Sequence, residues 1–317
     1  MANITALAGG IGGARFLRGL KLAAPDAQIT VIGNTADDIR LHGLHISPDL
    51  DTVMYTLGGG VHEEQGWGRA DESFTVAEEL AAHGIGPDWF TLGDRDIATH
   101  LIRTSMMSTG YALSEITEAL CDRWQPGVRL LPMSDDRIET HVVIDEGDGA
   151  RAIHFQEWWV RLHAKVPAER IVIVGVDKAP PGPGVLEALA TADVIVLPPS
   201  NPVVSIGPIL GVPGIREAVA ASSAPVVGLS PIIGGSPVRG MADACLTAIG
   251  VETSARAVAG LYSDILDGWL VDESDAALVP DITADGVTAR AVPLLMRDPT
   301  ATAAMAKAAL DLAAELR

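Results

Sequence analysis

The sequence predicts an α/β fold: a Rossmann-like, mostly parallel sheet with an inserted smaller, mainly helical lobe. A strand, a glycine turn, a helix and a second strand follow one another within residues 3–33. Such βαβ units build parallel sheets. Continuous apolar runs return in the second half of the chain, as strands buried on both faces require. Between these regions lies a stretch of different character, which carries all but one of the six tryptophans.

The opening unit consists of two apolar runs separated by glycines. Ile4–Leu7 ends in the glycine turn Gly9–Gly13, and a helical pattern then continues to a stop at Pro25. Ile29–Ile32 is the second expected strand. A long polar stretch follows over residues 34–51. We expect this stretch to be a functional loop, because long connections without structure of their own often carry function.

The remaining chain divides into a lobe and the rest of the core. We expect residues 61–164 to form the inserted lobe, and residues 1–60 and 165–317 to form the Rossmann-like core. Helical patterns dominate the lobe, at Asp94–Met107 and Ser114–Asp122. In the core we expect buried parallel strands at Ile171–Val174, Val194–Leu197 and Val226–Leu229, and helices near Val185–Ala192, Ile215–Ala221 and Ala301–Leu316.

Composition excludes several classes of protein. The formal charge is −19 over 317 residues, which disfavours a general nucleic-acid binder because an acidic surface repels phosphate backbones. Cys121 and Cys245 lack the spacing of a thiolate zinc site and are expected to be buried free thiols. The N-terminus does not resemble a signal peptide, and the apolar runs are too short to span a membrane. We expect a cytoplasmic protein without a membrane partner.

The glycine turn is the first candidate site. Gly9, Gly10, Gly12 and Gly13 would let the backbone approach a phosphate at the N-terminus of the following helix. Arg15 stands where a dinucleotide-binding motif needs glycine, and the lysine of a Walker loop is absent. The alternative is a turn that is packed tightly for structural reasons alone.

The second candidate site is a polar stretch around four carboxylates. Its members are Asn34, Thr35, Asp37, Asp38, Asp49 and Asp51. The stretch follows a parallel strand, and open α/β sheets bind their ligands at the carboxyl ends of strands. Mg²⁺ prefers one or two carboxylates together with substrate phosphates. The alternative is a solvated acidic loop, in which Asp51 begins a helix over Val53–Leu57.

Two further features offer groups for recognition of a phosphate or a base. Arg95 stands on the first turn of the helix expected over Asp94–Met107, where its fork suits phosphate or carboxylate. A surface salt bridge is the alternative. The proline-rich loop after Val194–Leu197 carries Asn201, Ser205 and Gly207, for which turn chemistry alone is the alternative.

Taken together, these segments resemble one family, the 2-phospho-L-lactate transferases (CofD/FbiA type) of coenzyme F-420 biosynthesis. The most specific segments are ISPDLDT, LGDRD and the SNP…SIGPI part of the proline-rich loop, and LAGGIGGARFLRGL, GNTADD and LSPIIGGSPVRG also match. The matching segments run in order from residue 6 to about residue 240. The last quarter of the chain matches more loosely.

The resemblance implies a transfer reaction. A guanosine diphosphate derivative of a three-carbon acid is the donor, and the ribityl hydroxyl of the deazaflavin Fo attacks the phosphorus that bears the acid. GMP leaves, and Mg²⁺ assists. The family implies a core that binds nucleotide and Fo, and a homodimer. Arginine exceeds lysine and alanine is abundant, as in a GC-rich actinobacterial genome, which favours enolpyruvate over lactate as the donated acid.

The resemblance also assigns roles to residues of this chain. It implies Asp49, Asp51 and Arg95 as catalytic residues and Asp37, Asp49 and Asp51 as metal ligands, with Asp38 in reserve. The four glycines would approach the nucleotide phosphates, Asn201, Ser205 and Gly207 would frame the guanosine, and Asn34 and Thr35 would also be binding residues. The alternative is a non-enzymatic nucleotide-sugar-binding regulator of a related family. That family is expected to continue with glycine and serine after the acidic pair, whereas this chain continues with Ile39–His42.

Overall fold

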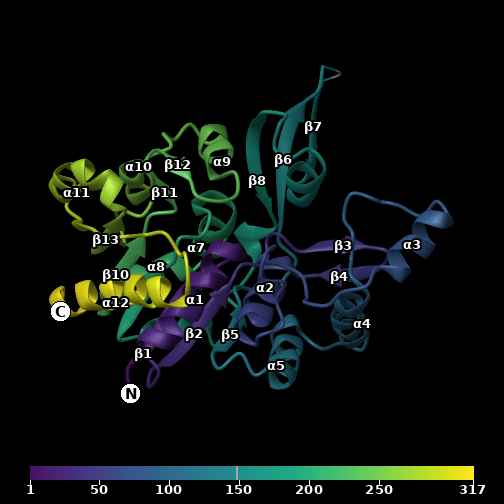
Figure 1. Cartoon of the computed structure of the whole chain (residues 1–317), viewed down its shortest axis with the longest axis horizontal. Helices are drawn as coiled ribbons and strands as arrows, with labels where there is room; N and C mark the ends of the chain where they lie inside the picture. Colours follow the sequence, from purple (N-terminus) through teal and green to yellow (C-terminus); the bar gives the residue numbers. More distant parts are fainter. Residues whose placement is uncertain (148) are drawn as a thin grey trace.

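Seven parallel strands form the central sheet of the computed structural model, which describes residues 1–147 and 149–317 (Figure 1). Their order across the sheet is β14 (Thr288–Ala291), β13 (Gly268–Val271), β10 (Val226–Leu229), β9 (Val194–Leu197), β1 (Asn3–Ala8), β2 (Gln28–Gly33) and β5 (Arg129–Pro132). Each neighbouring pair of strands is parallel. The predicted α/β class and Rossmann-like sheet are therefore confirmed.

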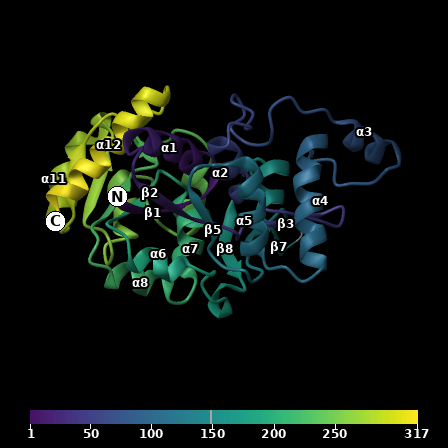
Figure 2. The same ribbon diagram turned by 90° about the horizontal axis from the view of Figure 1, so that it is seen from below.

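Helices cover both faces of this sheet, which is why its central strands are apolar throughout (Figure 2). All four residues of β9 and of β10 are buried. One face packs against α1 (Gly10–Ala23), α2 (Pro48–Leu57), α5 (Leu113–Trp124) and α12 (Pro299–Glu315). The other packs against α6 (Val185–Ala190), α7 (Gly207–Gly211), α8 (Ile215–Ala221), α9 (Ala242–Ala248) and α10 (Ala255–Gly260).

The strand order reverses between β1 and β9. From β1 the chain builds outward through β2 to β5, and from β9 it builds in the opposite direction through β10 and β13 to β14. Open α/β sheets bind ligands in the crevice at such a reversal, outside the carboxyl ends of the strands. The glycine turn follows β1 and the proline-rich loop follows β9, so both predicted segments lie at this position.

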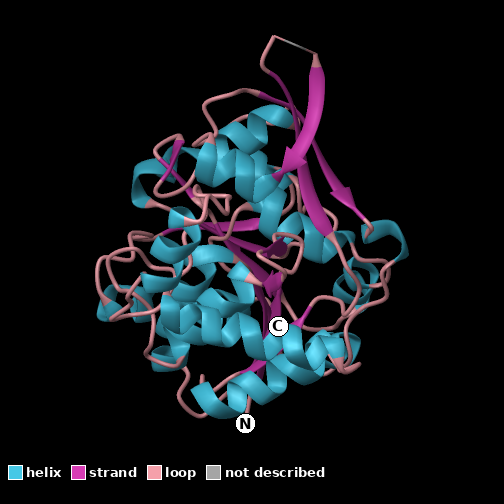
Figure 3. Ribbon diagram, turned by 90° about the vertical axis from the view of Figure 1, so that its right-hand side faces the viewer, coloured by secondary structure: helices cyan, strands magenta, loops and turns pink. Residues whose placement is uncertain are grey.

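The prediction of a parallel strand at Ile171–Val174 is wrong. This run lies in β8 (Ala168–Val174), which pairs antiparallel with β6 (Glu139–Asp145) in a separate three-stranded sheet completed by β7 (Ala150–His154). Figure 3 shows these strands extending away from the main body. Only one face of this sheet packs on the core, and Val174 is 51% exposed. Apolar composition alone therefore did not indicate burial on both faces.

The region expected as an inserted lobe contributes to more than one layer. It contains α3 (Thr75–Ala82) and α4 (Asp94–Ser108), together with α5. It also supplies β5, which pairs with β2 at the edge of the main sheet. The division of the chain at residues 61 and 164 stays a prediction.

The polar stretch after β2 is more structured than expected. Residues 34–51 contain an antiparallel hairpin, β3 (Ile39–Leu41) and β4 (Leu44–Ile46), and α2 begins at Pro48 rather than after Asp51. The expected unstructured loop is therefore wrong. Asp49 and Asp51 lie in the first turn of α2, where carboxylates are favoured by the helix dipole.

Short elements complete the chain. They are two π-helical turns (Glu157–Arg161 and Pro202–Ile206), two 3₁₀ turns (Val176–Lys178 and Glu273–Leu278), α11 (Val279–Ala284), and the strand pair β11 (Ile232–Ile233) and β12 (Ser236–Pro237). Among the described residues no single helix has the length and apolar character needed to cross a membrane. One pair, Pro202–Gly211 and Ile215–Ala221, meets the criteria jointly but is bent by 83°.

Candidate active site

Four segments that are distant in sequence meet at the carboxyl ends of β1 and β9. Gly9 follows β1, Asn34 follows β2, Asp49 begins α2, and Ser205 follows β9. Asn34 Nδ2 donates to Asp49 Oδ2 at 2.9 Å and to the carbonyl oxygen of Val204 at 3.1 Å. A Cβ atom at Gly9 would overlap Asp49 Oδ2 and lie 2.8 Å from Ser205 Cβ. The structure thus brings together residues from three of the predicted sites.

The glycines of the turn divide into two kinds. At Gly12 and Gly13 a Cβ atom would overlap the carbonyl oxygen of Pro199 or lie 2.5 Å from Ser200 Oγ, so these glycines permit close packing against the loop after β9. Gly10 differs, because its φ is +65° and the nearest atom to an added Cβ would be 3.9 Å away. The structural alternative therefore explains most of the turn, and Gly10 is the glycine that leaves space at the N-terminus of α1.

Three carboxylates are buried beside this turn. Asp37, Asp38 and Asp49 are 4%, 7% and 7% exposed. Burial, followed by the negative charges of Asp49 and Asp38, raises the pKa of Asp37 well above its usual range. Burial raises the pKa of Asp49 to about 6, although the Asn34 amide and the Gly10 backbone N–H oppose this. The cluster carries more negative charge than its surroundings neutralise, so a bound cation would stabilise it.

The residues of the cluster fit a magnesium ion that takes only part of its coordination from protein. Asp37 Oδ1 and Asp38 Oδ1 are buried and have no hydrogen-bond partner among the described residues. Within residues 1–147 and 149–317, no three His, Cys, Asp or Glu side chains are arranged as a complete metal site. Mg²⁺ commonly takes one or two carboxylates and completes its octahedron with phosphate oxygens and water. The arrangement suits that mode.

Asp51 lies in a different network from Asp49, since residues two apart on a helix do not face the same side. Its carboxylate forms an ion pair with Arg103, and His100 Nδ1 lies 3.7 Å from Asp51 Oδ2. His100 Nε2 lies 3.3 Å from Asp96 Oδ2, and Asp96 Oδ1 accepts a 2.6 Å hydrogen bond from the Tyr55 hydroxyl. This network joins α2 to α4. It favours a structural role for Asp51 over the predicted roles of catalyst and metal ligand.

The structure does not bring Arg95 to the glycine turn. Its side chain is 53% exposed, and its guanidinium lies 4.0 Å from the Asp71 carboxylate. Its backbone N–H donates to Glu72, and its carbonyl accepts from Arg69. These contacts match the surface salt bridge, which was the alternative for this residue.

The remaining predicted residues, three in the loop after β9 and Thr35 after β2, differ in how close they lie to the carboxylates. The Asn201 side chain caps the π-helical turn by accepting from Val203 and Val204 N–H, while Gly207 lies where that turn passes into α7. Ser205 is buried against Gly9. The Thr35 hydroxyl is buried next to the carboxylates and has no partner among the described residues. Ser205 and Thr35 are thus the members of this group nearest to the cluster.

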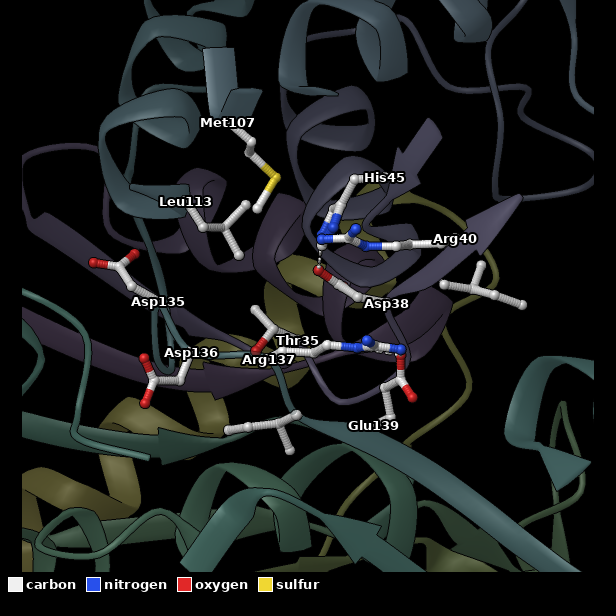
Figure 4. A pocket seen from close by; sticks show the side chains of 12 residues that line it. Thr35, Asp38, Arg40, His45, Met107, Leu113, Asp135, Asp136, Arg137 and Glu139 are labelled. Carbon is white, nitrogen blue, oxygen red and sulfur yellow. Dashed lines mark hydrogen bonds and ion pairs between the residues drawn. The ribbon is translucent and has the colours of Figure 1, made fainter. Parts of the chain in front are cut away.

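A pocket of about 90 Å³ opens beside the carboxylates (Figure 4). Its lining combines Thr35, Asp38, Ile39, Arg40 and His45 with Met107 and Leu113, and with residues 135–139 before and in β6. Asp38 Oδ2 contacts His45 Nε2 at 2.9 Å and accepts from Ser47 Oγ at 2.7 Å. The other oxygen of Asp38 and the Nδ1 atom of His45 have no partner among the described residues. The pocket therefore offers polar groups that a hydroxyl-bearing ligand can satisfy.

Sequence reasoning missed the network around Asp51. Asp96, His100 and Arg103 recur at spacings of four and three, which places them on one face of α4. That spacing was a usable signal, because three polar residues on a buried helical face need partners. It could not identify the partner on α2, which is remote in sequence.

Comparisons with known proteins identify the family of this chain. The family described as 2-phospho-L-lactate transferase CofD matches residues 4–291. Phosphoenolpyruvate transferases from Streptomyces griseus and Streptomyces coelicolor are 68% and 67% identical to this chain, each alignment covering 99% of both chains. One from Mycolicibacterium smegmatis is 57% identical over 98% of both.

Solved structures resemble the chain in fold. Two crystal structures of a Bacillus halodurans protein, one described as a member of the UPF0052 family, give TM-scores of 0.63 and 0.64 at 22% and 21% identity. Each covers 98% of this chain and 99% of its own. The structural likeness shows the fold, and the match over 4–291 shows the family. The chain belongs to the 2-phospho-L-lactate transferase CofD family.

Proposed function

We propose that this chain transfers a phosphoenolpyruvate moiety, or its 2-phospho-L-lactate counterpart, from a GMP-activated donor to the ribityl hydroxyl of Fo in coenzyme F-420 biosynthesis. The observation that carries the proposal is near full-length identity, from 55% to 68%, to relatives named phosphoenolpyruvate transferase. That name favours enolpyruvate as the donated acid. The buried carboxylates beside the α1 N-terminus supply groups that such chemistry needs.

The reaction has a simple balance of bonds. The ribityl oxygen attacks the phosphorus that bears the three-carbon acid, and the bond from that phosphorus to the bridging oxygen of GMP breaks. GMP leaves with the bonding electrons. The proton of the ribityl hydroxyl passes to a carboxylate. Transfers of this kind depend chiefly on positioning and on stabilising charge at the phosphorus.

Residues of the cluster would divide these tasks. Asp37 and Asp49 would hold Mg²⁺, which neutralises charge on the phosphoryl oxygens. Asp38 would accept the hydroxyl proton, because it lines the pocket and one of its oxygens has no partner among the described residues, while His45 and Ser47 fix the other oxygen. A proton acceptor must lie within hydrogen-bond reach of the hydroxyl, and the polar pocket offers a place for the ribityl chain. Backbone N–H groups at Gly10 would face the donor phosphates.

Turnover tests the proposal directly. Purified protein is mixed with Fo, Mg²⁺ and the guanylated three-carbon acid, and the products are separated for mass spectrometry. We expect GMP and an anionic Fo product, and the enolpyruvyl product is two hydrogens lighter than the lactyl one. Fo and donor that remain unchanged would refute the transferase. Binding of a nucleotide sugar without turnover would favour the regulator instead.

A further inference from the structure

Two arginines from separate elements converge on one loop beside the glycine turn. Arg15 lies on α1, and Arg239 follows β12. The loop, residues 62–68, is closed by a bridge between Val61 and Arg69. Arg15 Nη2 donates to the carbonyl oxygen of Glu63 at 3.3 Å, and Arg239 Nη2 donates to that of Glu64 at 3.2 Å. Both guanidinium groups therefore donate hydrogen bonds to the same short loop.

Both guanidinium groups lie next to the same glycine. A Cβ atom at Gly66 would come within 3.2 Å of Arg239 Nη1 and 3.3 Å of Arg15 Nη2. The same atom would lie 2.8 Å from Ile11, in the first turn of α1. The arginines are thus adjacent to one another and to the helix N-terminus that begins at Gly10.

Neither guanidinium is in direct contact with a carboxylate among the described residues, although Glu63 is close enough to act on Arg15. Neither Arg15 nor Arg239 has a carboxylate within 4.0 Å among the described residues, whereas the neighbouring Arg18 forms an ion pair with Glu63 at 2.8 Å. Burial, and then the charge of Arg239, lower the pKa of Arg15, and the negative charge of Glu63 offsets this only in part. Like charges brought together in this way favour an anion between them. Each guanidinium has five N–H donors, and its described contacts use one.

We propose that Arg15 and Arg239 form an anion clamp that binds the diphosphate of a guanosine nucleotide against the first turn of α1. The helix N-terminus contributes backbone N–H groups and the positive end of its dipole. The arginines contribute forked donors that match phosphate oxygens. The buried carboxylates, including Asp49 beside Gly10, would hold a cation that accompanies the diphosphate. The identity of the nucleotide in this inference rests on the proposed function.

Binding of GDP and of inorganic pyrophosphate, each with Mg²⁺, tests the clamp by calorimetry without turnover. Arg15→Gln and Arg239→Gln should each weaken both ligands by at least about tenfold, since a charge-assisted hydrogen bond contributes about 1.5–3 kcal/mol. Arg18→Gln is the matched control, because it removes a charge from the same helix that is already paired. It should change affinity by less than about twofold. Thermal unfolding of each variant checks that the fold persists.

The results for binding and for turnover test the clamp and the transferase activity independently. Unchanged affinity in both clamp variants would overturn the clamp, and turnover by the wild type in the same preparation would leave the transferase standing. Affinity that falls in Arg15→Gln and Arg239→Gln, in a wild type that never consumes the guanylated donor, would retain the clamp and refute the transferase. A wild type that binds neither GDP nor pyrophosphate would overturn the clamp, and its turnover of the guanylated donor would still decide the transferase.

Discussion

Replacing Arg103 with methionine would leave the Asp51 carboxylate buried between α2 and α4 without its cation. Arg103 is 1% exposed and Asp51 is 4% exposed, so water does not reach either group freely. Burial raises the pKa of Asp51, and the Arg103 guanidinium is the largest influence that lowers it. In the variant, Asp51 must either remain charged in an apolar setting or take up a proton.

The size of the effect follows from this burial. Removing one partner of a buried ion pair costs about 3–5 kcal/mol, because the remaining charge is left uncompensated. Domains are stable by about 5–15 kcal/mol in total, so Arg103→Met should remove a large part of the free energy of unfolding. Replacing both partners by apolar residues, as in Arg103→Met with Asp51→Leu, should recover most of the loss.

Urea unfolding of the ligand-free protein at neutral pH measures the effect by linear extrapolation. Arg216→Met is the control, because Arg216 forms an ion pair with Asp264 at the surface and should contribute less than about 1 kcal/mol. A loss below about 1 kcal/mol in Arg103→Met would refute the reasoning. Turnover by the double variant within about tenfold of wild type would assign Asp51 a structural role.

Four further outcomes are expected. Asp49→Asn should abolish most turnover while the protein remains folded, because an amide lacks the charge to hold Mg²⁺; near-normal rates would remove Asp49 from the site. Because the folded state raises the pKa of Asp49 from 3.8 to about 6, its contribution to the stability of the ligand-free protein is fully present below pH 4 and lost as pH rises to 6. That loss is up to about 3 kcal/mol, and Asp49→Asn should flatten the stability–pH curve measured by urea unfolding. Arg95→Lys should leave the turnover rate and KM within about twofold, since its contacts lie at the surface; a large rise in KM would return Arg95 to the site. Gly12→Ala should destabilise by about 1–3 kcal/mol through overlap with the Pro199 carbonyl, and an unchanged thermal midpoint would contradict the packing described here.

Local pattern was sufficient for the parts of the fold whose residues act within one element. The strands at Val194–Leu197 and Val226–Leu229 and the helix at Ile215–Ala221 have the predicted bounds. An apolar run ended by proline or serine defines each strand, and Gly214 and Ser222 flank the helix. The four-residue strands β13 and β14 were not predicted. β13 begins with glycine, and β14 begins with threonine and contains arginine, so neither begins with the aliphatic residues that marked the two predicted strands.

The candidate site was predictable in its location and less so in its details. Asp37 and Asp49 meet beside the glycine turn because the carboxyl ends of parallel strands share one edge of a sheet. The separation of Asp49 from Asp51 depends on α2 beginning at Pro48, and a helix start is uncertain by a few residues from sequence alone. The position of Arg95 depends on how α4 packs against its neighbours, which no local pattern encodes.

The central position of β1 has a consequence for synthesis of the chain. β1 pairs with β2 through Ile4 and Ile29, which leave the ribosome close together, but its other neighbour, β9, pairs through Val194. At about 5–20 residues per second, the second edge of β1 stays open for roughly 10–40 seconds. An open strand edge is a template for pairing with other chains. The nascent protein is therefore most exposed to aggregation at the strand that later carries its glycine turn, and the burial of this strand in the folded protein leaves no room there for a protective charge.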